Sequence, residues 1–161
     1  MLKNTVKSVR EQEFREYLQG KKLDAGKAWE LYMAKVYNAE QVFTTAASWE
    51  AGDLVAAGIH YQVKAYNGFW QGVVTLEGFE NHILNVCKAE RYLLKVGTSS
   101  EVTPGKEIWL DVDKQELLTL AQHGYIKFNR TAHGIQSAKW GMTQKEAMHL
   151  NMRMGIKPIK G

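Results

Sequence analysis

The chain has 161 residues, of which 45% are hydrophobic and 24% are charged, a balance typical of globular proteins that excludes collagen-like and disordered chains. Its length fits one domain, which we take to span residues 1–161, and is sufficient to bury a core without disulfides. The net charge of +4 is compatible with a nucleic-acid partner but does not by itself indicate one.

Apolar spacing and capping residues predict two helices near the N-terminus, over about residues 6–18 and 24–38. Two strands, 54–56 and 59–65, then flank Gly58. The elements predicted after them are a helix over 76–88, strands over 91–97 and 107–111, a helix over 113–122, a strand over 125–129 and a helix from Thr143 to about 154. This mixture predicts an α/β (α+β) domain with a central sheet flanked by helices.

The predicted strand over 59–65 carries polar and apolar residues in alternation. Successive side chains of a strand point to opposite faces, so His60, Gln62 and Lys64 share one face. The three residues between and before them, Ile59, Tyr61 and Val63, form an apolar face. One face of this strand therefore gathers side chains that can carry chemistry.

A two-residue turn at Ala57 and Gly58 would fix how this strand pairs with the preceding one. Antiparallel pairing from that turn sets Asp53 opposite Gln62. Directly opposed residues have Cβ atoms about 4.5–5.5 Å apart. Asp53 and Gln62 would then present oxygens to one point, with Lys64 one step further along the strand.

Such an arrangement suits Mg²⁺, which prefers hard oxygen ligands and keeps several waters; Mn²⁺ is the alternative ion. Asp53 supplies the charged ligand. The side-chain oxygen of Gln62 and the backbone carbonyl of Val63 supply neutral ligands. Lys64 holds the attacking water and offsets the charge that develops on a phosphoryl group.

Asp53, followed after a hairpin by Gln62-x-Lys64, resembles the PD-(D/E)XK nuclease superfamily. Some branches of this superfamily have glutamine where most have glutamate. Glu30 matches the glutamate that many members carry on the helix before the first motif strand. The resemblance covers about residues 24–97 and includes the helix and strand that follow Lys64.

The resemblance implies a restriction-endonuclease-like core, with a central mixed sheet of four to five strands, and a Mg²⁺-dependent DNA endonuclease. Asp53 and Gln62 would bind the metal, with Glu30 supporting them directly or through a water. Lys64 would position the nucleophile. Two departures stand out: Gly52 replaces the proline common before the aspartate, and Gln62 removes a negative charge from the metal site.

Aromatic and basic residues interleave over residues 64–70 and 125–130, a pattern that can stack bases or bind phosphates. Together with the histidine beside the motif, these segments give the predicted DNA contacts, which are His60, Tyr66, Asn67, Lys127 and Arg130. A homodimer with one site for each DNA strand is a further expectation, although no residue indicates it.

Other interpretations stay open. Asp53 can be an ordinary residue at a strand start, and Gln62 and Lys64 can be the solvated face of a half-exposed strand. The chain can also be a weak or inactive nuclease that only binds DNA. A third alternative is a small phage or mobile-element protein that acts through protein interactions alone.

Several classes of site and location are excluded or disfavoured. The single cysteine, Cys87, leaves no disulfide and no zinc site that needs paired cysteines, and its apolar neighbours predict burial. No glycine-rich phosphate loop appears. No apolar run reaches the roughly 18 residues that span a bilayer. We expect a cytoplasmic protein of a bacterium or phage, with no membrane partner.

Overall fold

A computed structural model describes residues 33–34, 38–41, 54–97, 108–132, 134–153 and 159–160, and the statements below concern those residues. Met33 and Ala34 are helical and buried, within the range predicted for the second helix. The first predicted helix and the rest of the second as far as residue 37 lie outside the described residues. The same holds for two predicted site residues, Glu30 and Asp53. The predicted end of the second helix at residue 38 is wrong, because Asn38 lies in a turn with a φ of +50°.

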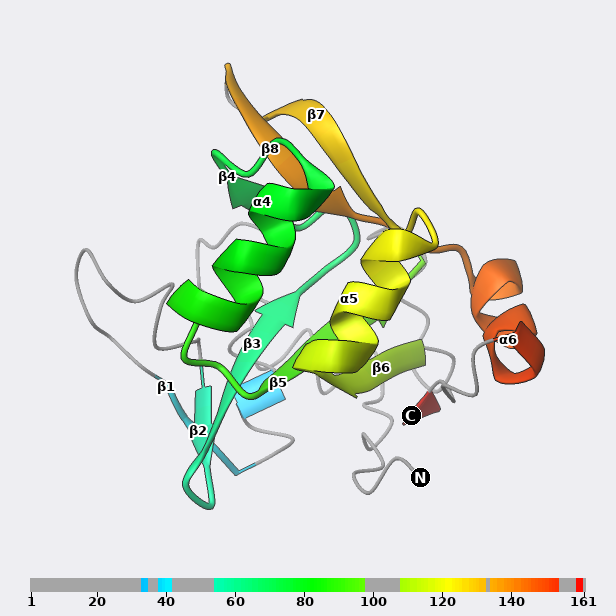
Figure 1. Ribbon diagram of the computed structural model, residues 1–161. Helices are drawn as coiled ribbons and strands as arrows, with labels where there is room; N and C mark the ends of the chain where they lie inside the picture. The colour runs from blue at the N-terminus through cyan, green and yellow to red at the C-terminus, as the bar shows by residue number, and fades with distance from the viewer. Residues whose placement is uncertain are drawn as a thin grey trace, which may run out of the picture.

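A six-stranded mixed sheet forms the centre of the fold (Figure 1). Its order is β1 (Glu40–Gln41), β2 (Leu54–Ala56), β3 (Ile59–Lys64), β5 (Arg91–Val96), β6 (Ile108–Asp113) and β9 (Ile159–Lys160). Only β3 and β5 run parallel among these neighbours. The α+β class and the mixed sheet are confirmed. Four longer strands match the predicted number, and the two-residue strands β1 and β9 extend the sheet at its edges.

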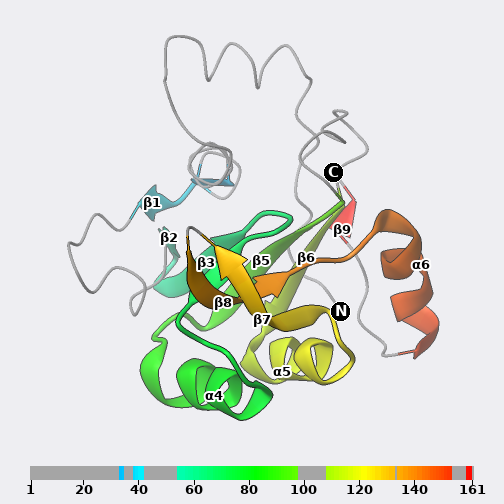
Figure 2. The same cartoon turned by 90° about the horizontal axis from the view of Figure 1, so that it is seen from above.

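Two helical segments cover one face of this sheet. They are α4 (Leu76–Asn81), which continues as the π-helical turn η1 (His82–Val86), and α5 (Lys114–Gln122). Both views place α4 and α5 on the same side of the sheet (Figures 1 and 2). The predicted helix over 76–88 is thus two segments, because the hydrogen-bond pattern widens at His82 and the backbone is extended again at Cys87.

Capping explains where the helices begin. The Asp113 carboxylate accepts a hydrogen bond from the backbone N–H of Glu116, and the Glu116 carboxylate accepts one from the backbone N–H of Asp113. This capping box satisfies N–H groups that lack helical partners. Thr143 and Glu146 exchange the same pair of bonds at the start of α6 (Gln144–Arg153). No helix in the described part of the chain has the length and hydrophobicity needed to span a membrane.

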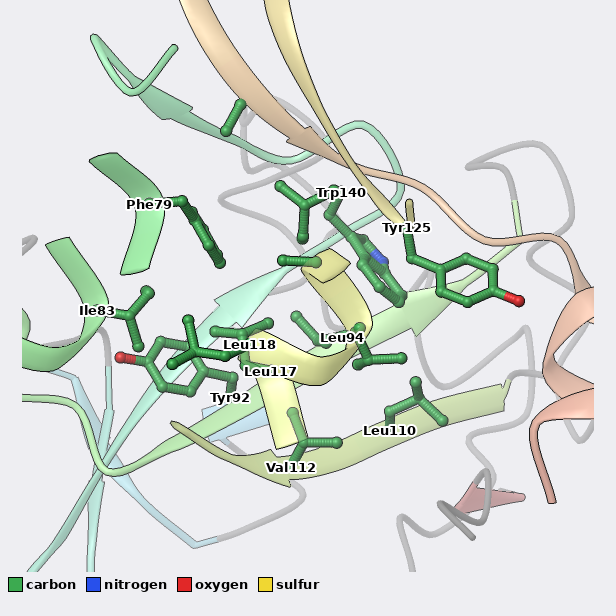
Figure 3. Close-up of a cluster of buried hydrophobic side chains, with 14 of the residues drawn as sticks. Phe79, Ile83, Tyr92, Leu94, Leu110, Val112, Leu117, Leu118, Tyr125 and Trp140 are labelled. Carbon is green, nitrogen blue, oxygen red and sulfur yellow. The ribbon is translucent and has the colours of Figure 1, made fainter. Parts of the chain in front are cut away.

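Each face of the central sheet has its own apolar core. The larger core joins α4, η1 and α5 to the side chains of Tyr92, Leu94 and Val112 (Figure 3). The smaller core, on the opposite face, includes Leu93 and Trp109. Successive residues of β5 therefore supply both cores, as the alternation of a strand buried on both faces requires.

A second sheet of three strands, absent from the sequence-based prediction apart from part of β7, packs on the larger core. It contains β4 (Phe69–Gln71), β8 (Ile135–Trp140) and β7 (Ile126–Ala132) in that order. Trp70, Ala138 and Trp140 belong to the core, and the indole Nε1 of Trp140 donates to the carbonyl of Lys95, at 2.7 Å. The hairpin of β7 and β8 extends beyond α4 and α5 (Figure 1).

Candidate active site

The hairpin of β2 and β3 has the predicted turn and register. Ala57 and Gly58 have φ values of +50° and +81°, the left-handed conformations that a type I′ turn requires at both positions. Leu54 pairs with Tyr61 and Ala56 with Ile59. Asp53, which the sequence predicts opposite Gln62, lies outside the described residues. The register that motivated the site prediction is therefore confirmed as far as Leu54.

Gln62 is buried, with only 4% of its surface exposed. It is in register with Tyr92 of β5, on the face that α4 and α5 cover. Its Oε1 atom has no hydrogen-bond partner among the described residues. A buried acceptor left without a partner costs about 1–3 kcal/mol. The interpretation of Gln62 as part of a solvated strand face is therefore wrong, and its amide oxygen has no hydrogen bond within the described part of the chain that a ligand would have to replace.

Lys64, at the end of β3, is held at the open edge of β4. Its Nζ donates to the carbonyl oxygen of Phe69, at 2.8 Å, and lies 4.9 Å from the centroid of the Trp70 ring. The Gly68 carbonyl accepts from Trp140 of β8, and because carbonyls alternate along a strand, that of Phe69 points away from β8. A cation over an indole ring gains about 0.5–2 kcal/mol. These contacts hold the ammonium group in place.

A tight turn connects Lys64 to β4. The N–H of Gly68 donates to the carbonyl of Ala65, at 2.8 Å, and Asn67 has a φ of +65°. A Cβ atom on Gly68 would lie 2.8 Å from that carbonyl and 3.1 Å from the Cβ of Lys64. Only glycine allows this close approach, so Gly68 helps to set the position of the Lys64 side chain.

The other predicted contacts fall in two places. His60 is half-buried on the face of Gln62, and Tyr66 and the exposed Asn67 form the turn after β3. Lys127 and Arg130 are exposed on β7, in the second sheet, which adjoins the site through β4.

Val63 is buried with its side chain in the smaller core, on the face opposite Gln62, so only its backbone carbonyl remains as the predicted metal ligand. Phe69, Trp70 and Lys139 are the neighbours that sequence reasoning did not assign to the site. Lys139 lies on β8, which has too little alternation between polar and apolar residues to be recognised as a strand.

Charged side chains that are buried or half-buried on the opposite face of the sheet do not join the site. Arg91 Nε binds Asp111 Oδ1 at 2.5 Å, and its Nη2 donates to the Asp111 carbonyl at 3.0 Å. Burial lowers the pKa of Arg91, but the hydrogen bond and negative charge of Asp111 raise it by more. Lys95 is fully buried and donates to the carbonyl of Gly97, at 3.3 Å. These side chains lie on the face of Leu93, so they stabilise the sheet away from Gln62.

The described donors fit one part of a cation site. Among the described residues, no group of three or more His, Cys, Asp or Glu side chains could hold a metal. The unpartnered Oε1 of Gln62 is the kind of neutral oxygen ligand that Mg²⁺ accepts. The carboxylates that would complete such a site, Asp53 and Glu30, lie outside the described residues.

Comparison of the chain with protein-family models, with curated proteins and with solved structures finds no match. The resemblance to PD-(D/E)XK nucleases accordingly depends on the motif residues and on the hairpin that carries them. Within that motif, Gln62 and Lys64 are the two residues whose surroundings the structure describes.

Proposed function

We propose that the chain is a DNA endonuclease that depends on Mg²⁺ or Mn²⁺ and acts at the hairpin of β2 and β3. The observation that carries the proposal is the unpartnered, buried Oε1 of Gln62, on the same strand face as Lys64. The described register ends at Leu54 and Tyr61; its extension by one residue, as the sequence predicts, would set the Asp53 carboxylate opposite that oxygen. The buried oxygen of Gln62 and the ammonium of Lys64, with the carboxylate expected at Asp53, are groups that can serve metal-assisted phosphodiester hydrolysis.

Each residue has a defined task in this proposal. When bound, a divalent cation polarises the scissile phosphate and lowers the pKa of a water. Gln62 contributes a neutral oxygen to the cation, and Asp53 contributes charge, with Glu30 in support. Lys64 exchanges its hydrogen bond to the Phe69 carbonyl for one to the attacking water or to a phosphate oxygen. The carbonyl and the Trp70 ring keep the ammonium in place before substrate arrives.

The test is a cleavage assay of the purified protein on duplex, branched and single-stranded DNA, with Mg²⁺, Mn²⁺ or EDTA. We expect product with a metal and none with EDTA. Lys64→Ala should lower kcat by about 100-fold or more, the usual effect of removing a group that assists proton transfer. Lys88→Ala, which removes an exposed lysine in the loop before β5, is the matched control and should cleave like the wild type.

Two results would contradict the proposal. Absence of metal-dependent product on every DNA substrate would contradict the proposal that the chain is a nuclease. Cleavage by Lys64→Ala at the wild-type rate would remove the role of Lys64 alone.

One observation favours a second candidate, a DNA-binding protein with a weak or inactive site. Gln62 stands where most of the resembling nucleases have glutamate, so the site has one carboxylate fewer for the metal. This candidate predicts salt-sensitive DNA binding without metal-dependent product. A protein that acts only through protein interactions would instead show no DNA binding even at low salt.

A further inference from the structure

The outer face of the second sheet carries a row of basic side chains. In the antiparallel register, Phe69 of β4 pairs with Lys139 of β8, and Lys139 pairs with Lys127 of β7. One step along, Gln71 pairs with Ser137, and Ser137 pairs with Arg130. Paired residues project to the same face, so both rows lie on the face opposite Trp70 and Ala138. Ser137, between Gln71 and Arg130, is buried, whereas Lys127 and Arg130 are exposed and Lys139 is half-buried.

A β-bulge places Arg130 on this face. Lys127 and Arg130 are three residues apart, and in a regular strand their side chains would point to opposite faces. The register shifts between them, and Asn129 has a φ of +61°. The extra residue restores the alternation, because two residues of β7 now oppose one of β8. Lys127 and Arg130 therefore extend from the same side of the sheet, and both are exposed.

The basic residues have no acidic neighbours in this sheet. β4, β7 and β8 contain no Asp or Glu. Lys127 and Lys139 are directly opposed, and like charges in such positions destabilise a sheet. An anion bound between them would remove that repulsion. The arrangement is therefore better suited to a polyanionic partner than to the stability of the sheet by itself.

This face meets the candidate active site at the edge of β4, where the Lys64 ammonium contacts the Phe69 carbonyl and, on the other face, the Trp70 ring. The first row begins with Phe69, whose carbonyl oxygen accepts the hydrogen bond from Lys64. Neighbouring strands lie about 4.8 Å apart, so the row from β4 to β7 extends about 10 Å. The two rows are two residues apart along β8, or about 7 Å, which equals two base-pair steps of about 3.4 Å along a duplex axis.

We propose that this basic face, formed by Lys127, Arg130 and Lys139, binds the phosphate backbone of duplex DNA and brings the strand to Lys64. The inference rests on the proposed function, since it names the DNA form on which the same site acts. Proteins that select single strands use several aromatic side chains as stacking platforms. Here Phe69 is the aromatic residue of the face and it is half-buried, so ionic contacts dominate. A duplex, which has the higher charge density, is the form that the face fits.

Binding can be measured separately from cleavage, by fluorescence anisotropy of a labelled DNA duplex in EDTA over a range of salt concentrations. The double variant Lys127→Ala/Arg130→Ala should raise the Kd for the duplex by about 10-fold or more at low salt. Each phosphate contact contributes about 0.9 to the slope of log K against log salt, so the slope should fall by about 2. Lys139→Ala should lower it by about 1. The control, Lys88→Ala/Lys145→Ala, removes two exposed lysines outside this sheet. Its Kd and its salt slope should change only by the small amount that the loss of two positive charges from the whole protein causes.

The outcomes separate the inference from the proposed function. Equal effects of the double variant and the control, no salt-dependent binding by the wild type, or tighter binding of single-stranded DNA than of duplex would each overturn the inference. Loss of duplex binding in the face variants alone would support it, even if the wild type cleaves no DNA and the nuclease proposal fails. Because these changes remove repelling charges at half-buried or exposed positions, thermal unfolding should show a Tm equal to or above that of the wild type.

Discussion

Replacing Gln62 by Glu tests the candidate site without an activity assay. The change keeps the length of the side chain but introduces a carboxyl group where only 4% of the residue is exposed. Burial disfavours the ionised form, so the pKa of this carboxyl should rise above about 4.3, its ordinary value. A rise of two to three pKa units corresponds to about 3–4 kcal/mol of lost stability. Lys64, two residues along the same strand face, offsets part of this loss.

The sign of the pH dependence follows from that pKa. Below about pH 4.3 the carboxyl is protonated in both the folded and the unfolded chain, so Gln62→Glu should be nearly as stable as the wild type. As the pH rises toward the raised pKa, the unfolded chain ionises first and the free energy of unfolding falls. Above the raised pKa the loss is complete, and the difference in the free energy of unfolding between Gln62→Glu and the wild type no longer changes with pH.

A divalent cation should reverse this loss. Urea unfolding at several pH values, with EDTA or with Mg²⁺, measures the effect directly. An ion at 100 times its Kd adds about 2.7 kcal/mol to the stability of the folded state. We expect Mg²⁺ to stabilise Gln62→Glu more than the wild type, because the new carboxylate adds a charged ligand at the position of the unpartnered oxygen.

Gln62→Leu is the control for this experiment. It removes the unpartnered acceptor, so its stability in EDTA should equal or exceed that of the wild type, and Mg²⁺ should add nothing. The reasoning fails if Mg²⁺ stabilises Gln62→Glu no more than Gln62→Leu. It also fails if Gln62→Glu in EDTA at pH 8 unfolds at the same urea concentration as the wild type.

Two further predictions concern the hairpin turn and a buried phenol. Both turn positions have positive φ, so Ala57→Gly should raise the free energy of unfolding by about 1 kcal/mol and Gly58→Ala should lower it by about 1–2 kcal/mol. No atom lies within 4 Å of a Cβ at Gly58, so the loss in Gly58→Ala comes from backbone strain and not from a clash. A loss of stability in Ala57→Gly or a gain in Gly58→Ala, measured by urea unfolding, would contradict the turn assignment. Burial and the neighbouring Cys87 raise the pKa of Tyr92, so stability should be complete below about pH 10, where a tyrosine in the unfolded chain begins to ionise, and fall above it. Tyr92→Phe should abolish the loss of stability above pH 10. At pH 8 it should cost about 1 kcal/mol, because the hydrogen bond to the Ala89 carbonyl is lost. If the variant loses stability above pH 10 as the wild type does, Tyr92 is not the cause of that loss.

Local patterns predicted the elements that carry the candidate site. Alternation over β3 and the small residues at Ala57 and Gly58 determine the hairpin register, which the structure reproduces. Capping at Thr143 located the start of α6 because the signal lies within four residues. The burial of Gln62 could not be predicted in this way, since it depends on α4 and α5 covering that face of the sheet.

The second sheet was largely missed because its strands depend on tertiary contacts. β4 has three residues, too few for a period to be visible. β8 places Ser137 and Ala138 side by side in buried positions, so its sequence lacks the polar–apolar alternation of a half-exposed strand. The bulge at Asn129 also breaks the pattern of β7, which explains why the predicted strand over 125–129 ends three residues before Ala132. For the same reason Lys139 could not be placed beside Lys127.

The position of β3 between an antiparallel and a parallel neighbour has a consequence for the order of folding. Its pairing with β2 closes a loop of two residues, and such hairpins form in about 1–10 μs. Its pairing with β5 joins Tyr61 to Arg91 and closes a longer loop, which contains β4, α4 and η1. Because closing the longer loop costs more entropy, this parallel contact forms later. We therefore expect the register of Gln62 to be set early by its neighbour in the chain, and its burial to come only with β5 and the helices.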